Sequence, residues 1–296
     1  MYDLIIIGAG PAGLTAALYA LRSNKNVLVL EAKTFGGQII NAHKIENYPG
    51  IPCISGVEYA TTLYNQVKKF GAEFKFETVI RIRENKEVIT NKNTYKAKAI
   101  IIATGAEKRK LGIENESNYV GKGISYCATC DGNFFKEKKV AVVGGGNTAL
   151  EDALYLADLA SKVYIIHRRD NFRGEERLYD ELKNKSNVEF ILNSNVVKLN
   201  GTKKLESVEV KDYSNNITTI EVQGLFVAVG QEPKNEIFKN VVELNEFGYI
   251  VSNDGVHTSN SGIYVAGDAR VKTLRQLTTA VGDGALAATT AIKELK

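Results

Sequence analysis

Two cysteines stand close together in the segment Cys127-Ala-Thr-Cys130-Asp131. Two intervening residues put the sulfurs within reach of a disulfide bond if the turn between them is helical. A thiolate is the nucleophile in thiol–disulfide exchange, and Asp131 is a candidate proton donor or acceptor for it. The pair therefore indicates redox chemistry. Two buried free cysteines, or half of a metal site, are the alternatives.

The other cysteine and the histidines argue against a metal. A structural zinc site takes four ligands. The third cysteine, Cys53, is far away in the sequence, and His43, His167 and His257 are scattered. We therefore predict no metal site and expect Cys53 to be a packed small residue. A reducing compartment does not keep structural disulfides, so a close pair there favours redox work.

The segment 8–13, Gly-Ala-Gly-Pro-Ala-Gly, is a candidate phosphate-binding turn between an apolar strand at 2–7 and an amphipathic helix. Gly8 permits the tight turn, Gly10 lets the backbone approach a pyrophosphate, and Gly13 lets helix and strand pack closely. The N–H groups at the start of the helix attract phosphate. Glu31 ends the next strand and can accept hydrogen bonds from a ribose diol. The predicted dinucleotide site contains Gly8, Gly10, Pro11, Ala12, Gly13 and Glu31.

A second turn, Gly-Gly-Gly-Asn-Thr-Ala at 144–149, has a different residue at the ribose position. His167 stands where Glu31 stands in the first copy, and arginines follow it. A carboxylate would repel a 2′-phosphate, whereas guanidinium groups bind it through charge-assisted hydrogen bonds. We predict NADPH here and FAD at the first turn; a solvated basic strand end is the alternative. The predicted NADPH residues are Gly144, Gly146, Asn147, Thr148, His167, Arg168, Arg169 and Arg173.

The two turns belong to an internal repeat. Residues 3–31 align with residues 139–167 at a constant offset and without a gap. Gly8 falls on Gly144 and Gly13 on Ala149, and each copy has the pattern strand, glycine turn, amphipathic helix, second apolar strand. This pattern is typical of a βαβ unit with buried parallel strands.

The segments after each copy predict how the chain divides. "AIIIATG" at 99–105 and "GLFVAVG" at 224–230 are similar apolar strands that end in a glycine turn. The segment 261–295 contains a further strand, a Gly-Asp turn and an Ala-rich helix, and we expect it to return to the first domain. The predicted fold is α/β, with two Rossmann-like three-layer domains, the second inserted in the first. We expect an FAD domain at 1–111 and 238–296 and an NADPH domain, which carries the cysteine pair, at 112–237.

Composition limits the other function classes. Of the 296 residues, 44% are hydrophobic and 24% charged, which is the balance of a soluble globular protein. The net charge of +4 is too small to indicate nucleic acid or a membrane surface. No apolar run is long enough to span a bilayer, and no signal-peptide pattern begins the sequence. We expect a cytoplasmic protein.

Nine short motifs together resemble the low-molecular-weight, bacterial-type NADPH-dependent thioredoxin reductases, and the likeness covers essentially the whole chain. "CATCDG" followed downstream by "HRRD" is the most specific of these similarities. The motifs are "GAGPAG" at 8–13, "GGQI" at 36–39, "ENYPG" at 46–50, "ATGA" at 103–106, "CATCDG" at 127–132, "GGGNTA" at 144–149, "HRRDNFR" at 167–173, "AGDAR" at 266–270 and "RQ" at 275–276.

The resemblance implies further cofactor-binding residues. In such a protein Asp268 faces the ribityl–phosphate region of the flavin, and Gln276 lies near its ring. Thr148 and the arginines hold NADPH. The FAD residues implied by the resemblance, beyond those of the first turn, are Gly36, Gly37, Gln38, Asn47, Thr104, Gly105, Gly267, Asp268, Arg275 and Gln276.

The resemblance also implies a mechanism and partners. NADPH reduces FAD, FAD reduces the Cys127–Cys130 disulfide, and after a domain rotation the cysteines reduce oxidised thioredoxin. Such proteins are homodimers. Either cysteine could attack the partner protein, although the resemblance makes Cys130 the neighbour of the flavin. Two alternatives stay open: a reductase of another thioredoxin-fold or glutaredoxin-like protein, and a flavin redox sensor without turnover.

Overall fold

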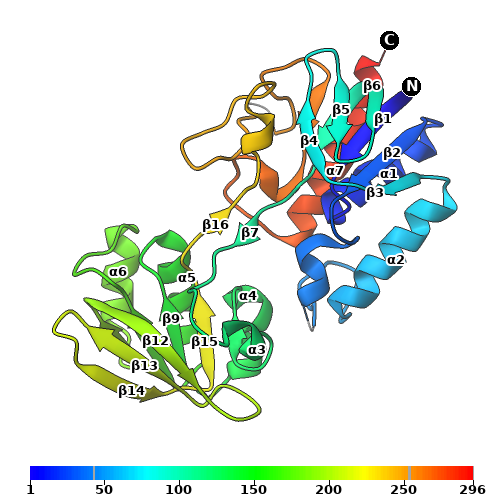
Figure 1. Cartoon of the computed structure of the whole chain (residues 1–296). Coiled ribbons are helices and arrows are strands. Elements are labelled where there is room, and N and C mark those ends of the chain that lie inside the picture. The colour runs from blue at the N-terminus through cyan, green and yellow to red at the C-terminus, as the bar shows by residue number, and fades with distance from the viewer. Residues whose placement is uncertain (43, 253–254, 296) are drawn as a thin grey trace. The chain divides into compact units, whose positions relative to one another are not determined.

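The computed structural model describes residues 1–42, 44–252 and 255–295, and the chain forms two compact units (Figure 1). Unit 1 consists of Met1–Glu107 and Glu232–Lys296, and unit 2 of Lys108–Gln231. The chain thus leaves unit 1 once and returns to it. Each break lies a few residues before the crossing expected from the sequence, near 111 or 238.

A seven-stranded sheet forms the centre of unit 1. Its parallel strands lie in the order β3-β2-β1-β6, and β17 pairs with the second half of β6. Two antiparallel strands, β5 and β4, continue from the first half of β6. The strands are β1 (Tyr2–Ile7), β2 (Val27–Glu31), β3 (Glu73–Phe76), β4 (Val79–Ile82), β5 (Glu87–Thr90), β6 (Thr94–Ile102) and β17 (Ile263–Val265).

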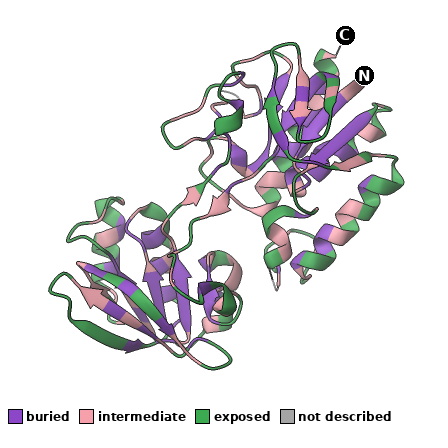
Figure 2. Cartoon of the chain, in the orientation of Figure 1, coloured by how far each residue is buried: buried purple, intermediate pink, exposed green. Residues whose placement is uncertain are grey.

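Side chains of β1 alternate between two buried cores, as the two-residue period of a strand requires. Leu4 and Ile6 pack with the helices, whereas Ile5 and Ile7 pack with β4, β5 and the segment around Phe238. The middle of the sheet is therefore buried on both faces, and Figure 2 shows its central strands β1 and β2 mostly in the buried colour, whereas β3 at the edge has no buried residue. The helices of unit 1 are α1 (Pro11–Arg22), α2 (Gly56–Lys69), α7 (Leu277–Glu294) and the short 3-10 helices η1 (Gly37–Asn41), η3 (Glu236–Phe238) and η4 (Gly267–Ala269).

The C-terminal segment completes unit 1, as the sequence predicted. β17 adds to the sheet in parallel with β6, with Ile263 opposite Ile100. α7 then lies against α1 at very short range, because a Cβ atom on Gly284 would come within 2.2 Å of the carbonyl oxygen of Ala12. Small residues in both helices allow this close approach.

Unit 2 repeats the same plan with a five-stranded parallel sheet in the order β11-β10-β9-β15-β8. Helices cover one face, and a three-stranded antiparallel sheet, β12-β13-β14, packs on the other. The strands are β8 (Ile124–Ser125), β9 (Lys139–Val143), β10 (Lys162–Ile166), β11 (Val188–Ile191), β12 (Ser194–Asn200), β13 (Ser207–Asp212), β14 (Ile217–Glu221) and β15 (Gly224–Val227). The helices are α3 (Glu116–Tyr119), α4 (Ala128–Asp131), α5 (Asn147–Ala157), α6 (Glu176–Lys183) and the 3-10 helix η2 (Gly132–Phe135).

Two short strands, β7 (Glu107–Lys108) and β16 (Gln231–Glu232), pair with each other where the chain passes between the units. In both units a glycine turn leads from the central strand into the helix that follows it, so the predicted repeat is present as two βαβ units. Within the described part of the chain, none of the helices is both long and apolar enough to cross a membrane.

Candidate redox and dinucleotide sites

Cys127 and Cys130 are joined by a disulfide bond, with their Cα atoms 5.3 Å apart. Cys127 is the N-cap of α4, and the N–H of Asp131 donates to its carbonyl oxygen at 3.1 Å. The helical turn expected between the cysteines is therefore present, and both cysteines are partly exposed. Cys53 is exposed rather than packed, so that prediction is wrong: it lies in a short surface loop closed by the Ile45–Ile54 bridge.

A buried hydroxyl connects Asp131 to the first cysteine. The Oγ atom of Ser125 donates to Oδ2 of Asp131 at 2.6 Å and accepts from the N–H of Cys127 at 3.1 Å. Ser125 ends β8 and is buried, so the parallel sheet fixes its position. This link holds a carboxylate beside the disulfide in a defined orientation.

The first glycine turn has the close backbone contacts that its sequence predicted. Gly8 has a φ of +109°, and a Cβ atom there would lie 2.4 Å from the carbonyl oxygen of Ala103. A Cβ atom on Gly13 would lie 1.9 Å from the carbonyl oxygen of Gly8. Gly10 instead has open space, since the nearest atom to its Cβ position is the Cα of Gly37 at 4.0 Å. Protein therefore fills the space beside Gly8 and Gly13, but a ligand can approach Gly10.

Glu31 accepts hydrogen bonds from backbone amides, and one of these amides belongs to the first glycine turn. Its Oε2 accepts from the N–H of Ala9 at 2.8 Å, and its Oε1 accepts from the N–H of Lys33 at 2.9 Å. A carboxylate has about four acceptor positions, so lone pairs remain for a ribose diol. The same side chain can thus shape the turn and bind a ribose.

Several other residues predicted for FAD lie against this turn. The N–H of Gly36 donates to the carbonyl of Ala9 at 2.7 Å, which brings the segment 36–38 to it. Ala103, the neighbour of Thr104, contacts Gly8. Thr104 donates from its Oγ1 to Oδ1 of Asn235 at 3.0 Å.

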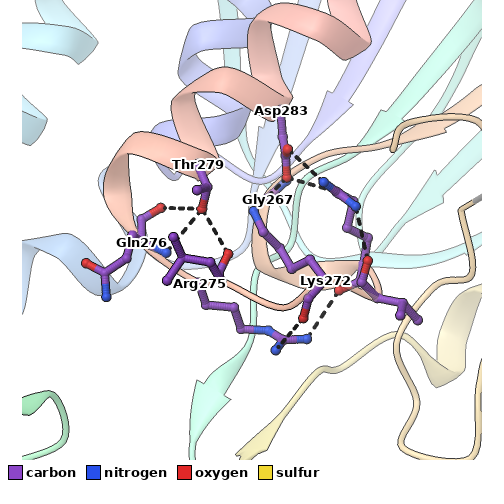
Figure 3. Close-up of polar contacts among 9 residues, drawn as sticks. Gly267, Lys272, Arg275, Gln276, Thr279 and Asp283 are labelled. Atoms are coloured by element: carbon purple, nitrogen blue, oxygen red, sulfur yellow. Dashed lines mark hydrogen bonds and ion pairs between the residues drawn. The ribbon is translucent and has the colours of Figure 1, made fainter. Parts of the chain in front are cut away.

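The segment from Gly267 to Gln276 lies beside the start of α1 and leads into α7 (Figure 3). Gly267 has a φ of +74°, and its Cβ position is only 2.8 Å from the Cβ of Ala12. Gln276 is the N-cap of α7 and forms a capping box with Thr279. Its Oε1 also accepts from Nδ2 of Asn47 at 3.1 Å. Residues far apart in the sequence are thus assembled around one turn.

A buried ion cluster holds this segment (Figure 3). Oδ2 of Asp283 accepts from Nε of Arg270 at 2.9 Å, from Nζ of Lys272 at 2.8 Å and from the N–H of Gly267 at 3.1 Å, and Oδ1 accepts from Nη2 of Arg270 at 3.0 Å. Arg275 lies over the ring of Tyr249, 4.2 Å from its centroid. Asp283 therefore fixes the backbone on which Asp268 stands.

The second glycine turn is shaped by His167. A Cβ atom on Gly145 would lie 2.1 Å from Cε1 of His167, so only glycine fits under this ring. His167 is buried, stacks on Phe172 with ring centroids 5.1 Å apart and donates from Nε2 to the carbonyl of Asn171 at 3.1 Å. Burial lowers the pKa of His167, the nearby arginines add to that effect, and the Asn171 hydrogen bond opposes it. His167 is thus a packing residue of the turn, and burial disfavours the charged form of its ring.

The predicted arginines differ from His167 in exposure. Arg168, Arg169 and Arg173 are all exposed, and within the described residues their guanidinium groups form no ion pair. The N–H of Arg173 donates to the carbonyl of Gly145 at 2.7 Å, which connects this basic segment to the second glycine turn. Three uncommitted positive charges therefore lie next to the turn that begins α5.

The starts of α1 and α5 fit dinucleotide phosphates. The N-caps are Gly10 and Gly146, and neither helix has a side-chain cap at this end. A Cβ atom on Gly146 would meet nothing within 4 Å. Uncapped amides, the positive end of the helix dipole and open space are the properties that bind phosphate groups.

Sequence reasoning missed three residues. Ser125 is not part of any recognisable motif. The role of Asp283 depends on its pairing with Arg270, which only the tertiary structure shows. Glu116 is buried, and it accepts hydrogen bonds from the N–H of Leu111 at 3.0 Å and from Oη of Tyr126 at 2.7 Å. It thereby ties the start of unit 2 to the residue before Cys127.

Comparison with known proteins places this geometry in a family. The model of the pyridine nucleotide-disulphide oxidoreductases matches residues 2–284. The chain therefore belongs to the pyridine nucleotide-disulphide oxidoreductase family, which confirms the predicted α/β fold with Rossmann-like units.

Within this family the chain is similar to bacterial thioredoxin reductases. The enzyme of Listeria innocua is 44% identical, with 100% of this chain and 95% of that protein covered. The enzyme of Bacillus subtilis is 43% identical, with 97% and 93% covered. The crystal structure of the Streptococcus pyogenes thioredoxin reductase matches with a TM-score of 0.93 at 43% identity and covers 99% of this chain and 97% of its own.

Proposed function

We propose that this chain is an NADPH-dependent thioredoxin-disulfide reductase that uses FAD. The observation that supports this most strongly is the Cys127–Cys130 disulfide linked through Ser125 to Asp131. It occurs in one chain with two uncapped glycine turns. The names of the similar proteins from Listeria innocua and Bacillus subtilis support thioredoxin as the substrate.

The two cofactors have different binding residues in this proposal. When bound, NADPH supplies a hydride and FAD relays its two electrons to a disulfide. The amides at the start of α1 bind the FAD pyrophosphate, and Glu31 binds its ribose. In unit 2 the start of α5 binds the NADPH pyrophosphate, and Arg168, Arg169 and Arg173 bind the 2′-phosphate.

Thiol–disulfide exchange is the work of the cysteines. Reduction of the Cys127–Cys130 bond takes up two electrons and, to give two thiols, two protons. One thiolate then attacks a sulfur of the thioredoxin disulfide, forms a mixed disulfide and releases one thioredoxin thiolate. The second cysteine attacks the mixed disulfide, restores the Cys127–Cys130 bond and releases the second thioredoxin thiolate. Which cysteine attacks first stays open.

Asp131 handles the proton of this exchange. Its carboxylate is held by the 2.6 Å hydrogen bond from Ser125 and belongs to the same helical turn as both cysteines. It can accept the proton of the attacking thiol and return it to the leaving thiolate of thioredoxin. The hydroxyl of Ser125 keeps the carboxylate oriented through both steps.

The comparisons do not favour another thioredoxin-fold or glutaredoxin-like substrate, or a sensor without turnover. The rotation of one domain against the other, the homodimer and the cytoplasmic location stay predictions from the resemblance and the sequence. The absence of a membrane-crossing helix among the described residues gives no location by itself.

An anaerobic titration tests the proposal. NADPH should bleach the flavin absorbance of the purified protein, and oxidised thioredoxin should restore it. Cys127→Ser and Cys130→Ser should keep the bleaching by NADPH but lose steady-state thioredoxin reduction, whereas Cys53→Ser, a change at the exposed third cysteine, should keep both. Thioredoxin reduction at the normal rate by either active-pair variant would contradict the proposal, as would faster turnover with a glutaredoxin than with thioredoxin.

A further inference from the structure

Tyr213 is an exposed aromatic residue with no role in the mechanism above. It lies in the turn between β13 and β14, and it is 67% exposed. Its hydroxyl nevertheless donates a hydrogen bond to the backbone carbonyl of Arg168. A side chain 45 residues further along the chain is therefore bonded to the segment that is proposed to bind the 2′-phosphate of NADPH.

Backbone contacts attach the three-stranded sheet to the arginine segment independently of that hydroxyl. The N–H of Ser194 donates to the carbonyl of His167 at 3.0 Å, and Ser194 starts β12 opposite Asp212 of β13. The N–H of Asn193 donates to the carbonyl of Arg169 at 3.2 Å. These two bonds lie one on each side of the carbonyl described above, so they bring the end of β13 next to it.

The turn that carries Tyr213 is closed by its own hydrogen bonds. The N–H of Asp212 donates to the carbonyl of Asn216 at 3.0 Å, and the Asp212 carboxylate accepts from the N–H and from Nδ2 of Asn216, both at 2.9 Å. Asn215 has a left-handed φ of +66°, which lets the chain reverse within a few residues. The backbone around Tyr213 is therefore already held, so its hydroxyl loses little conformational freedom when it bonds to Arg168.

The basic segment thus has a fixed backbone and exposed charges. The carbonyls of residues 167–169 accept from Ser194, Tyr213 and Asn193 in that order. The guanidinium groups of the two arginines in this range are exposed. A guanidinium group binds phosphate through directed, often paired hydrogen bonds, so a backbone that is held before binding lowers the entropic cost of forming them.

We propose that Tyr213 is a positioning residue that determines the preference for NADPH over NADH, because its hydroxyl holds Arg168 where the guanidinium group binds the 2′-phosphate. This role rests on the proposed function. NADPH and NADH differ only in that phosphate, so a displacement of Arg168 weakens the binding of NADPH and leaves that of NADH unchanged.

Binding of adenosine 2′,5′-bisphosphate and adenosine 5′-monophosphate to the oxidised holoenzyme tests the proposal without thioredoxin. The two probes differ only in the 2′-phosphate, and isothermal titration calorimetry measures both dissociation constants. Tyr213→Phe removes the hydroxyl and keeps the ring. It should weaken binding of the bisphosphate about threefold to tenfold, as expected for one lost hydrogen bond, and leave that of the monophosphate unchanged. In stopped flow, the NADPH concentration that half-saturates flavin reduction should rise by the same factor, with the limiting rate unchanged.

Two further comparisons isolate the contact between Tyr213 and Arg168. In an Arg168→Ala background, Tyr213→Phe should have no further effect on either probe, because the hydroxyl acts through Arg168. Ile217→Ala removes a large exposed side chain from β14 in the same hairpin and should match the wild type. Flavin content and thermal unfolding identify any variant that fails to fold.

The possible outcomes separate this role from the proposed function. If the wild type prefers the bisphosphate and folded Tyr213→Phe keeps the same preference, the role of Tyr213 is overturned and the NADPH site stands. Equal weakening of both probes, or an undiminished effect in the Arg168→Ala background, would overturn the role as well. A wild type without any preference for the bisphosphate would overturn the proposed NADPH site and, with it, the role of Tyr213.

Discussion

Asp283→Asn should destabilise unit 1 and weaken its hold on FAD. The wild-type carboxylate accepts hydrogen bonds from Arg270, Lys272 and the N–H of Gly267 (Figure 3). The Lys272 side chain is only 5% exposed and that of Arg270 16%. In the variant, the positive charges of Arg270 and Lys272 would have little access to water and would face an uncharged amide instead of a carboxylate.

The expected cost follows from this burial. Removal of one partner from a buried ion cluster costs about 3–5 kcal/mol, whereas an exposed pair contributes about 0–1 kcal/mol. A unit of this size loses about 2–4 °C of melting temperature per kcal/mol. We therefore expect a decrease of about 10 °C, together with weaker FAD binding because the turn that carries Asp268 loses its anchor.

The pH dependence of this effect has a definite sign. Burial alone would raise the pKa of Asp283, but the hydrogen bonds and charges of Arg270 and Lys272 outweigh it and lower the pKa. A carboxyl group with a lowered folded-state pKa stabilises the fold above its unfolded pKa of about 3.9. The difference between wild type and variant should thus be constant from pH 8 to pH 5. It should shrink as the pH falls below about 4.

Thermal unfolding followed by circular dichroism and by flavin fluorescence measures both effects. Glu236→Gln is the matched control, because Glu236 forms an exposed ion pair with Lys239 in the same unit. The control should change the melting temperature by about 4 °C or less. If Asp283→Asn is no more harmful than this control at pH 7, Arg270 and Lys272 do not depend on Asp283 for compensation and the reasoning fails.

Three other substitutions test the sites. Gly13→Ala should abolish FAD binding, because its Cβ would lie 1.9 Å from the carbonyl oxygen of Gly8. Ala149→Gly, at the matching position of unit 2, should lower the free energy of unfolding by only about 1 kcal/mol. Flavin content after purification and unfolding midpoints measure these effects, and full flavin content in Gly13→Ala would contradict the turn geometry. Arg168→Ala should raise the KM for NADPH about tenfold or more, while kcat and the KM for NADH stay unchanged. Steady-state assays measure these constants, and equal effects on both nucleotides would rule out binding of the 2′-phosphate by Arg168. Ser125→Ala should reduce kcat with thioredoxin about threefold to tenfold but leave flavin bleaching by NADPH unchanged in stopped flow, and unchanged turnover would show that Asp131 needs no such support.

Much of the fold was predictable because its signals are local. The strand at 2–7 follows from its apolar run, the turn after it from the spacing of its glycines, and the helix from Pro11 from the residue preferences at a helix start. The internal repeat then predicted the same order of strand, glycine turn and helix for unit 2. The return of the C-terminal segment to unit 1 was also predictable, since an unpaired apolar strand needs a sheet, and β17 pairs with β6.

The candidate site was predictable where a motif carries the chemistry and unpredictable where burial decides it. The Cys127–Cys130 pair and the arginines after His167 could be named from residue type and spacing alone. His167 itself belongs to the same basic segment, yet it is buried against Phe172 while Arg168 is exposed. Residue type does not reveal which side of a strand end faces the core.

Sequence alone determined the two glycine turns, the redox pair and the inserted order of the two units, because each depends on neighbours along the chain. Tertiary structure alone decided the environment of the acidic groups. Asp283 meets Arg270 and Lys272, and Ser125 meets Asp131, only once the elements have packed. The charge state of a carboxyl group depends on its burial and on the groups that face it in space, and neither is written in the order of the residues.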